Sequence, residues 1–247
     1  MKHKIISVIS AFLIGLTLTA CDSSAPEPND ANSDKTSVHE NSDKTGSKAE
    51  ASEEIESSDT ADTDSSKGSQ NTLDGTNILV AYFSRADENY NVGTIEVGNT
   101  QIVAEYIAEQ VGADSFHIET VTPYPADYDK CCDVAKQELA DNARPEINGS
   151  VENMDSYDIV FLGYPIWWGD MPMAVYTFIE SYDFSDKVVI PFNTHEGSGK
   201  SGTYSAISSA LPNAQVLDGM AIQGKTAQEF NSDTQQAVRS WLDGLGF

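Results

Sequence analysis

Basic residues are scarce in this chain of 247 residues. It has 14 lysines and arginines against 39 aspartates and glutamates, which gives a net charge of −25 at pH 7. A nucleic-acid-binding surface needs clustered lysines and arginines, so the composition argues against that class of function. The acidic surplus instead suits solubility, or electrostatic docking to a partner protein with a basic surface.

Cysteine is also scarce, with three residues in the whole chain. Cys131 and Cys132 are neighbours in sequence, and a disulfide needs Cα atoms about 4.4–6.8 Å apart with side chains that point toward each other. We therefore expect two free thiols and assign no redox chemistry to them. The sequence predicts no metal site.

Long apolar runs are missing as well. The most apolar stretch, Ile5 to Leu18, is shorter than the roughly 20 residues of an ordinary membrane-spanning helix. It follows two lysines and predicts a signal peptide over residues 1–20. Leu18-Thr19-Ala20-Cys21 resembles a bacterial lipobox. By that resemblance Cys21 carries the lipid anchor of an exported lipoprotein of the cell membrane or envelope; the alternative is an ordinary secretory signal with an incidental cysteine.

The segment that follows, residues 22–70, has almost no large aliphatic residues. Only Val38 and Ile55 occur, among 13 acidic residues and 4 lysines. Such a segment cannot bury enough apolar surface to offset the entropy lost on ordering, so we expect disorder. As a flexible coil it would average roughly 35–42 Å from end to end. We interpret residues 21–70 as the lipidated cysteine and an acidic, serine-rich tether.

The folded domain is predicted over residues 71–247, a size that suits one domain. Apolar runs predict strands at 77–83, 115–121, 159–163, 187–192 and 214–217, and periodic patterns predict helices at 100–111, 128–142, 173–181, 201–211 and 227–242. Asp170 is the expected N-cap of the third helix. This alternation predicts a three-layer α/β sandwich, in which a five-stranded parallel sheet has helices on both faces. Ligands of such sheets bind outside the carboxyl ends of the strands.

The loop after the third strand reads YPIWWG over residues 164–169. Trp167 and Trp168 are adjacent, so they cannot both point into the same core. We expect at least one of them to offer its face to a flat ligand. Which of the two does so stays open.

The loop after the first strand points to an anion site. Ser84 and Arg85 follow this strand, and the next helix begins near Asn99 and Thr100. A helix start has free N–H groups that attract anions, and hydroxyl and amide side chains can complete a phosphate site. The alternative is that Ser84 only ends the strand and that Asn99 or Thr100 only caps the helix.

The loop after the fourth strand is rich in glycine. Gly197, Gly199 and Gly202 match the spacing of a dinucleotide fingerprint, but that fingerprint belongs after the first strand of its fold. Gly199-Lys200-Ser201 is similar to the end of a P-loop, yet Thr194 stands where the first glycine is needed. What remains is a turn whose backbone can approach a planar ligand closely. His195 begins it, either as a ligand contact or simply as an exposed residue.

Together these motifs resemble the flavodoxin-like FMN proteins, and most closely the bacterial lipoprotein-type branch. The resemblance spans Asn77 to Leu245 and rests on residues 78–84, 98–100, 164–169 and 194–199. It implies FMN as the cofactor, with the phosphate at the first loop and the isoalloxazine between the other two. The implied cofactor-binding residues are Ser84, Arg85, Asn99, Thr100, Pro165, Ile166, Trp167, Trp168, Gly169, Thr194, His195, Glu196, Gly197, Ser198 and Gly199.

The chain departs from that family pattern at residues 85–97, which interrupt the phosphate loop. The insert could dock a partner or cover the phosphate, and it leaves the role of Arg85 open. The resemblance implies an electron carrier that works with a protein partner at the envelope. An NAD(P)H-dependent flavin or quinone reductase of the same fold is the alternative, and a binding module without redox function is a third class.

Overall fold

The computed structural model describes residues 75–247. The predicted signal peptide, Cys21, the whole predicted acidic tether and residues 71–74 of the predicted domain lie outside the described residues. Within residues 75–247, no helix combines the length and the apolar character needed to cross a membrane.

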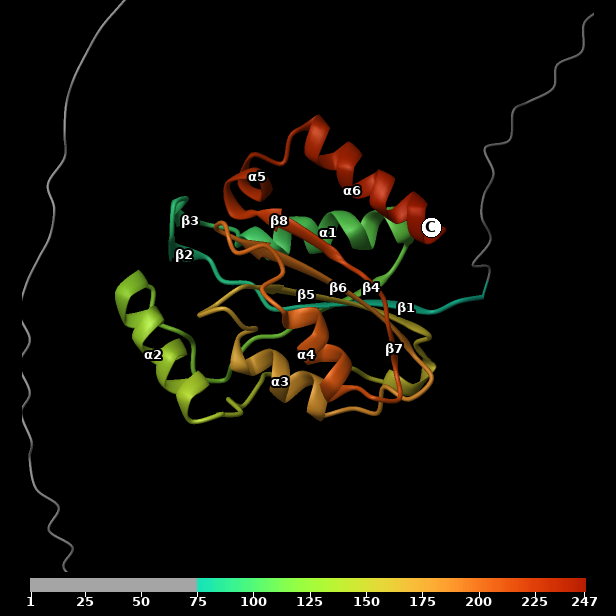
Figure 1. The fold of residues 1–247 in the computed structure, drawn as a ribbon, viewed down its shortest axis with the longest axis horizontal. Coiled ribbons are helices and arrows are strands. Elements are labelled where there is room, and N and C mark those ends of the chain that lie inside the picture. The colour runs from blue at the N-terminus through green and yellow to red at the C-terminus, as the bar shows by residue number, and fades with distance from the viewer. Residues whose placement is uncertain (1–74) are drawn as a thin grey trace, which may run out of the picture. The chain divides into compact units, whose positions relative to one another are not determined.

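A parallel sheet forms the centre of the domain (Figure 1). Its strands are β1 (Ile78–Tyr82), β4 (Asp114–His117), β5 (Ile159–Pro165), β6 (Val188–His195), β7 (Gln215–Val216) and β8 (Met220–Gln223). The order is β4-β1-β5-β6, and both β7 and β8 pair with the far side of β6. The predicted parallel sheet flanked by helices is confirmed, and β4 lies at one edge of it.

The predicted fifth strand at 214–217 is wrong in its extent, because two short strands replace it. β7 pairs with the start of β6 and β8 pairs with its end. Between them the chain passes Gly219, where an added Cβ would collide with the carbonyl of Pro191 in β6. Since proline also lacks the N–H that a ladder needs, the pairing along β6 stops after Val189 and resumes at Phe192.

The helices cover both faces of the sheet. They are α1 (Asn99–Val111), α2 (Tyr128–Ala140), α3 (Met173–Glu180), α4 (Thr203–Ala210), α5 (Gly224–Glu229) and α6 (Ser232–Leu245), with a short 3-10 turn at Met154–Ser156. α1, α5 and α6 lie on one side in Figure 1, and α2, α3 and α4 on the other.

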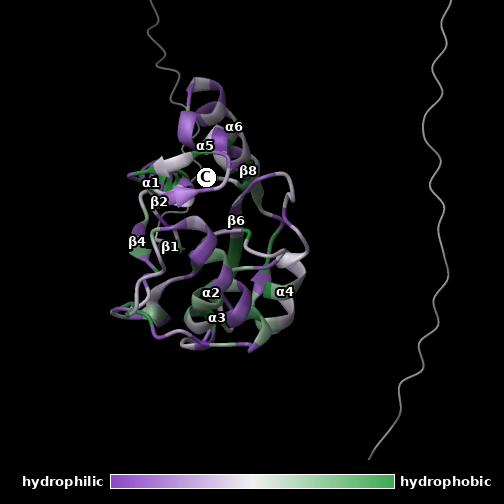
Figure 2. Ribbon diagram, turned by 90° about the vertical axis from the view of Figure 1, so that its left-hand side faces the viewer, coloured by the Kyte–Doolittle hydropathy of each residue, from purple (hydrophilic) through white to green (hydrophobic). Residues whose placement is uncertain are grey.

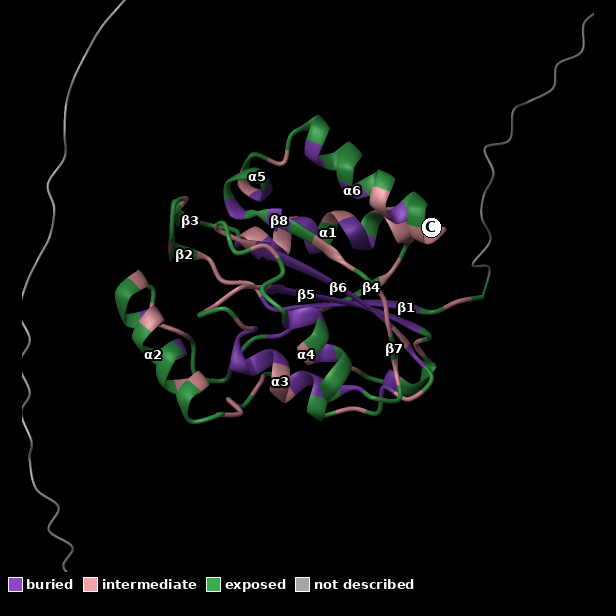
Figure 3. Ribbon diagram, viewed as in Figure 1, coloured by how far each residue is buried: buried purple, intermediate pink, exposed green. Residues whose placement is uncertain are grey.

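Side chains of β1 alternate between two hydrophobic clusters, as the period of a strand requires. Leu79 belongs to the cluster that α3 and α4 complete, whereas Val80 belongs to the cluster of α1 and α6. β1, β5 and β6 are buried along nearly their whole length (Figure 3). This explains why their sequences are continuous apolar runs rather than alternating ones.

Two helix boundaries differ from the prediction. The expected helix at 227–242 is two helices, because Phe230 has a φ of 28° and Asn231 caps α6 by accepting from the amides of its second and third residues. Asp170 does not cap α3. Pro172 stands at that N-cap, while Asp170 Oδ1 accepts from Met171 N (2.7 Å) and Tyr176 Oη (3.0 Å).

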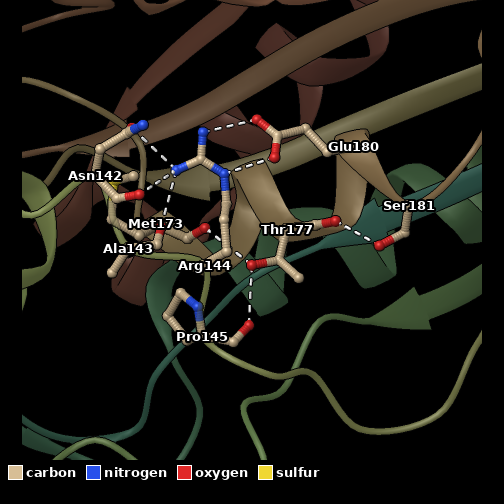
Figure 4. A network of polar contacts seen from close by, with 8 residues as sticks. All are labelled: Asn142, Ala143, Arg144, Pro145, Met173, Thr177, Glu180 and Ser181. Carbon is tan, nitrogen blue, oxygen red and sulfur yellow. Dashed lines mark hydrogen bonds and ion pairs between the residues drawn. The ribbon is translucent and has the colours of Figure 1, made fainter. Parts of the chain in front are cut away.

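A polar network joins the segment after α2 to α3 (Figure 4). Arg144 donates to both carboxylate oxygens of Glu180, at 2.7 Å each, and to the carbonyl oxygen of Asn142 at 3.0 Å. Thr177 Oγ1 donates to the carbonyl of Pro145 at 2.9 Å. These contacts hold the carboxyl end of α2 against α3. In Figure 2, α2 is largely hydrophilic and the central strand β6 is hydrophobic.

The insert at residues 85–97 forms an antiparallel hairpin, β2 (Asp87–Asn89) and β3 (Gly93–Ile95). It lies beside the start of α2 in Figure 1. The sequence indicated an interruption of the phosphate loop but not its structure, because strands of only three residues are too short to show an apolar pattern.

Candidate functional site

The three loops singled out by the sequence meet at the carboxyl ends of β1, β5 and β6. Thr100 Oγ1, in the first turn of α1, lies 2.8 Å from Thr194 Oγ1 at the end of β6. Ile166 N, just after β5, donates to the carbonyl of Thr194 at 2.9 Å. The first hydrogen bond joins two buried side chains and the second joins two main-chain groups. Together they fix the three loops relative to one another.

The start of α1 is held close to the end of β1. Ser84 Oγ accepts from Gln101 N at 3.0 Å, so Ser84 supplies the capping contact that the sequence suggested for Asn99 or Thr100. Gly98, at the N-cap, has no side chain to do this. An added Cβ on Gly98 would collide with Ser84 Oγ and with the backbone of Arg85, so only glycine allows this approach. The Ser84 hydroxyl keeps its own proton for donation to an anion.

The amide of Asn99 is oriented by a second helix. Gln228 Nε2 of α5 donates to Asn99 Oδ1 at 2.8 Å and to the carbonyl of Val97 at 2.8 Å. These contacts orient the Asn99 side chain so that its NH₂ group lies next to Gly224. A Cβ added to Gly224 would collide with that NH₂ group. The helix start therefore presents main-chain N–H groups, an amide donor and a hydroxyl, the set that binds a phosphate.

A carboxylate from the glycine-rich turn reaches the same place. Glu196 Oε2 accepts from Asn91 Nδ2 (3.3 Å) and Gln223 Nε2 (3.5 Å). Its Oε1 is buried and has no donor among residues 75–247. Buried polar atoms nearly always have a partner, so a ligand hydroxyl would complete this carboxylate. The ribityl chain of FMN carries such hydroxyls.

His195 shapes the turn from within. Its Nδ1 accepts from Gly197 N at 2.9 Å. Burial lowers the pKa of His195, because it removes water from the charged imidazolium, whereas the neighbouring Glu196 carboxylate opposes that shift. Gly197 and Gly199 have φ values of 113° and 59°, which side chains other than glycine rarely adopt. Because its glycines have no side chains, the turn presents main-chain N–H and C=O groups to a ligand that lies beside it.

A cavity of about 270 Å³, which we call the slot, lies between these loops. It brings together ten of the predicted residues and two that were not predicted. Its lining residues are Asn99, Pro165, Ile166, Trp167, Trp168, Gly169, Thr194, His195, Glu196 and Ser198, together with Tyr90 and Tyr128. Thr100 contacts the lining residue Thr194, whereas Ser84 lines another cavity, of about 480 Å³, together with Arg85 and Gln101. Gly197 and Gly199 shape the glycine-rich turn without lining the slot.

The two tryptophans have different surroundings. Trp167 packs edge-on against Phe83 (5.2 Å between ring centroids, 83°) and Tyr124 (5.0 Å, 88°), so one part of it belongs to the core. Trp168 is 54% exposed, and its Nε1 donates to the carbonyl of Cys132 at 3.0 Å. Trp168 and Gly169, with φ of 52° and 83°, form a tight turn closed by two hydrogen bonds between Trp167 and Asp170. This turn is what pushes Trp168 out of the core.

Arg85 does not line the slot. Its Nη1 donates to the carbonyl of Glu88 (2.6 Å), and its Nη2 donates to the carbonyls of Pro125 and Ala126 (2.7 Å each). These contacts anchor the hairpin to the loop before α2. The Arg85 side chain therefore has a structural role, and it lines another cavity together with the predicted phosphate-binding residue Ser84. Its contact with the phosphate stays a prediction.

Sequence reasoning missed Tyr90 and Tyr128. Their rings are stacked, with centroids 6.0 Å apart, and Glu88 Oε2 accepts from Tyr128 N at 3.1 Å. Tyr90 lies at the tip of the insert, beside the Asn91 that contacts Glu196. The hairpin thus spans the slot from α2 to the glycine-rich turn. Tyr90 is the one aromatic residue of the insert, and this was the available signal.

The residues present fit FMN. A helix start with amide, hydroxyl and main-chain donors suits the phosphate, the unpaired Glu196 oxygen suits a ribityl hydroxyl, and the slot offers an aromatic face and glycine backbone for the ring. Among residues 75–247, no group of histidine, cysteine, aspartate or glutamate side chains is placed to hold a metal ion.

Comparison with known proteins gives the family of this chain. The flavodoxin family model matches residues 77–244. A Bacteroides eggerthii protein provisionally described as a flavoprotein is 31% identical, with a TM-score of 0.57, over 70% of this chain and 99% of its own. A similarly described Bacteroides uniformis protein is 28% identical, with a TM-score of 0.56, over 68% and 99%.

A flavoprotein from Lactobacillus acidophilus, solved in complex with FMN, is 20% identical over 62% of this chain and 97% of its own, with a TM-score of 0.49. A search of the curated proteins found no match. The family match covers nearly the whole of the described domain. It supports FMN as the cofactor, as the sequence predicted. The chain belongs to the flavodoxin family.

Proposed function

We propose that this protein binds FMN and carries electrons to or from a protein partner at the cell envelope. The observation that carries the proposal is the slot, which joins an anion-binding helix start to an aromatic, glycine-lined ring site at one edge of the sheet. Bound FMN would supply one- or two-electron transfer. The chain's own residues bind it, orient it and limit its exposure to water.

Each end of the slot has a separate task in this proposal. Ser84, Asn99 and the first amides of α1 hold the phosphate. The turns at 165–169 and 194–199 hold the ring from two sides, with Trp168 available for stacking. The hairpin covers the middle through Tyr90, so FMN would enter and leave when the hairpin and the Glu196 turn separate.

The charge of the domain supports a protein partner. Residues 71–247 carry 26 acidic side chains and 8 lysines and arginines. A partner with a basic docking surface would be steered toward such a domain, and the steering would weaken as salt is added. The envelope location rests on the lipobox-like sequence at Cys21.

A reductase that uses NAD(P)H is the second candidate function, and one observation favours it. A further cavity of about 520 Å³ adjoins the slot and shares Tyr128, Ile166, Trp167 and Trp168 with it. An electron carrier that meets only a protein partner does not need such a space. A reductase needs room for a small second substrate next to the flavin.

One experiment separates these candidates. The full chain is purified, its absorbance is recorded with and without added FMN, and NADPH is then added without oxygen. A yellow protein that NADPH does not bleach supports the carrier, and rapid bleaching supports the reductase. A colourless protein that takes up no FMN refutes both.

A further inference from the structure

A groove between α2 and the loop after β4 lies outside the slot, and we call it the edge groove. It encloses about 300 Å³ and shares no lining residue with the slot. Main-chain hydrogen bonds fix the loop that forms it. Val121 N donates to the carbonyl of Glu146 at 2.8 Å, and Asn148 N donates to the carbonyl of Glu119 at 2.7 Å. The groove is therefore preformed, which reduces the entropy lost when a partner binds.

The lining of the edge groove is largely apolar and open to solvent. Val121 and Val134 are 47% and 37% exposed, and they are two of the five large apolar side chains that residues 75–247 leave exposed. Pro123, Pro125 and Pro145 form much of the remaining lining. Because proline rings lose almost no side-chain freedom when they are covered, an apolar side chain of a partner would be buried here with little loss of entropy.

The charge of the edge groove is negative. Glu138 and Glu146 line it, and among residues 75–247 no lysine or arginine does. Burial raises the pKa of Glu138, and the hydrogen bond that Tyr124 Oη donates to Glu138 Oε2 at 2.6 Å opposes this shift. The Glu138 carboxylate is thus partly desolvated. A lysine or arginine of a partner would supply the positive charge that the groove itself lacks.

An aromatic contact joins the edge groove to the slot. Tyr124 lines the groove, and its ring lies edge-on to the ring of Trp167, with centroids 5.0 Å apart. Trp167 in turn lines the slot. Two aromatic side chains in contact therefore connect a partner docked in the groove with the ring site.

We propose that the edge groove is the docking site of the protein partner, and that it takes up an apolar side chain of that partner with a lysine or arginine on either side. The apolar side chain would cover Val121 and Val134, and the basic residues would face Glu138 and Glu146. As a docking site for electron transfer, the groove rests on the proposed function. Binding of such a segment does not need FMN, so it can be tested separately.

The probe is the blocked tripeptide lysine–leucine–lysine, which carries the expected chemistry in its smallest form. Two further blocked peptides are controls. Lysine–glycine–lysine has the same charge without the apolar side chain, and glutamate–leucine–glutamate has the opposite charge. The full chain, labelled with ¹⁵N, is titrated with each peptide with and without FMN, and NMR follows its backbone amides and the indole N–H of Trp167.

We expect the lysine–leucine–lysine peptide to shift the amide signals of Val121, Val134 and Glu138 saturably, with a Kd in the millimolar range. The indole N–H of Trp167 should shift along the same binding curve, because Tyr124 contacts its ring. Replacing leucine by glycine in the peptide should weaken binding about tenfold or more, since the burial of one large apolar side chain is lost. The glutamate–leucine–glutamate peptide should not bind.

Two pairs of variants test the apolar and the charged part of the groove. Val134→Lys places a positive charge among the lining residues and should weaken binding of the lysine–leucine–lysine peptide strongly. Ala140→Lys adds the same charge at an exposed position of α2 outside the groove and should have little effect. Glu138→Gln keeps an acceptor for Tyr124 but removes a charge, so it should weaken binding about threefold. Glu109→Gln, at an exposed position of α1, removes the same charge away from the groove and should leave binding unchanged.

Three results would overturn the inference: no saturable shift in the wild-type chain, equal shifts with the lysine–glycine–lysine peptide, or unchanged binding in the Val134→Lys variant. Changes of the same amide signals on dilution of the chain without peptide would assign the groove to a second copy of the chain, and would also overturn it. Peptide binding in a chain that takes up no FMN would refute the proposed function and leave the groove as a docking site for a basic partner. FMN uptake without peptide binding would do the reverse.

Discussion

The different surroundings of Trp167 and Trp168 lead to opposite expectations for their replacement by alanine. Trp168 is 54% exposed and makes one hydrogen bond, to the carbonyl of Cys132. Trp167 packs against two aromatic rings of the core at 5.2 and 5.0 Å. We therefore expect Trp168→Ala to affect FMN binding and Trp167→Ala to affect mainly the stability of the fold.

The magnitudes follow from these contacts. Loss of a stacked aromatic partner weakens binding by about 1 kcal/mol, which is roughly a fivefold rise in the Kd for FMN. Replacing a fully buried tryptophan by alanine lowers the free energy of unfolding by about 3–5 kcal/mol. Because Trp167 is only partly buried, we expect about 2 kcal/mol for Trp167→Ala and less than about 1 kcal/mol for Trp168→Ala.

Two titrations measure these effects. Quenching of FMN fluorescence gives the Kd, and urea unfolding of the FMN-free chain gives the free energy of unfolding. Trp241→Ala is the matched control, since Trp241 packs edge-on against Phe161 in the other hydrophobic cluster, away from the slot. It should destabilise the fold and leave the Kd unchanged. If both slot tryptophans can be replaced without loss of FMN affinity, the ring lies elsewhere and the reasoning fails.

Three further predictions concern the phosphate end, the ribityl chain and an ion pair. Gly98→Ala should weaken the binding of FMN at least tenfold, because the new Cβ collides with Ser84. The binding of riboflavin, which lacks the phosphate, should stay nearly unchanged. Equal losses of affinity for both flavins in a binding titration would contradict a phosphate site at this helix start. Glu196→Ala should weaken FMN and riboflavin but not lumiflavin, which lacks the ribityl hydroxyls, and an equal loss for lumiflavin would exclude a hydroxyl contact. The hydrogen-bonded Arg144 guanidinium lowers the pKa of Glu180 below its ordinary value. The pair therefore stabilises the fold at pH values above the unfolded-state pKa of Glu180. That stabilisation is lost as the pH falls through the folded-state pKa of Glu180. Glu180→Gln should lower the free energy of unfolding by no more than about 1 kcal/mol at pH 7. In urea titrations the difference from the unchanged chain should shrink as the pH falls through the folded-state pKa of Glu180, and a difference that stays constant as the pH is lowered would contradict the charge pairing.

The central strands could be predicted because each is buried on both faces. β1, β5 and β6 require apolar side chains at nearly every position, and such runs stand out in a polar sequence. The end of the sheet could not be predicted in the same way. The split between β7 and β8 depends on the contact between Gly219 and Pro191, which are 28 positions apart in the chain. A local pattern does not contain that information.

The same distinction applies to the candidate site. The turns at 165–169 and 194–199 follow predictable strands, so their meeting at one edge of the sheet could be deduced from the parallel order. The contributions of Tyr90 and Tyr128 to the slot could not be deduced in this way. They depend on where the hairpin docks, and that position is set by Arg85 and the carbonyls of residues 125 and 126, some 40 positions further on. Arg85, which the sequence suggested as a phosphate ligand, positions the hairpin through these contacts.

That attachment has a consequence for how the protein can vary. All the groups that accept from Arg85 are main-chain carbonyls, and every amino acid supplies a carbonyl. Substitutions at the accepting positions would therefore keep the anchor, provided that the backbone keeps its path. The tip of the hairpin, with Tyr90 and Asn91, can change independently of its base. The sequence of the hairpin tip can therefore vary while Arg85 keeps the base attached, and different tips would cover the same flavin site.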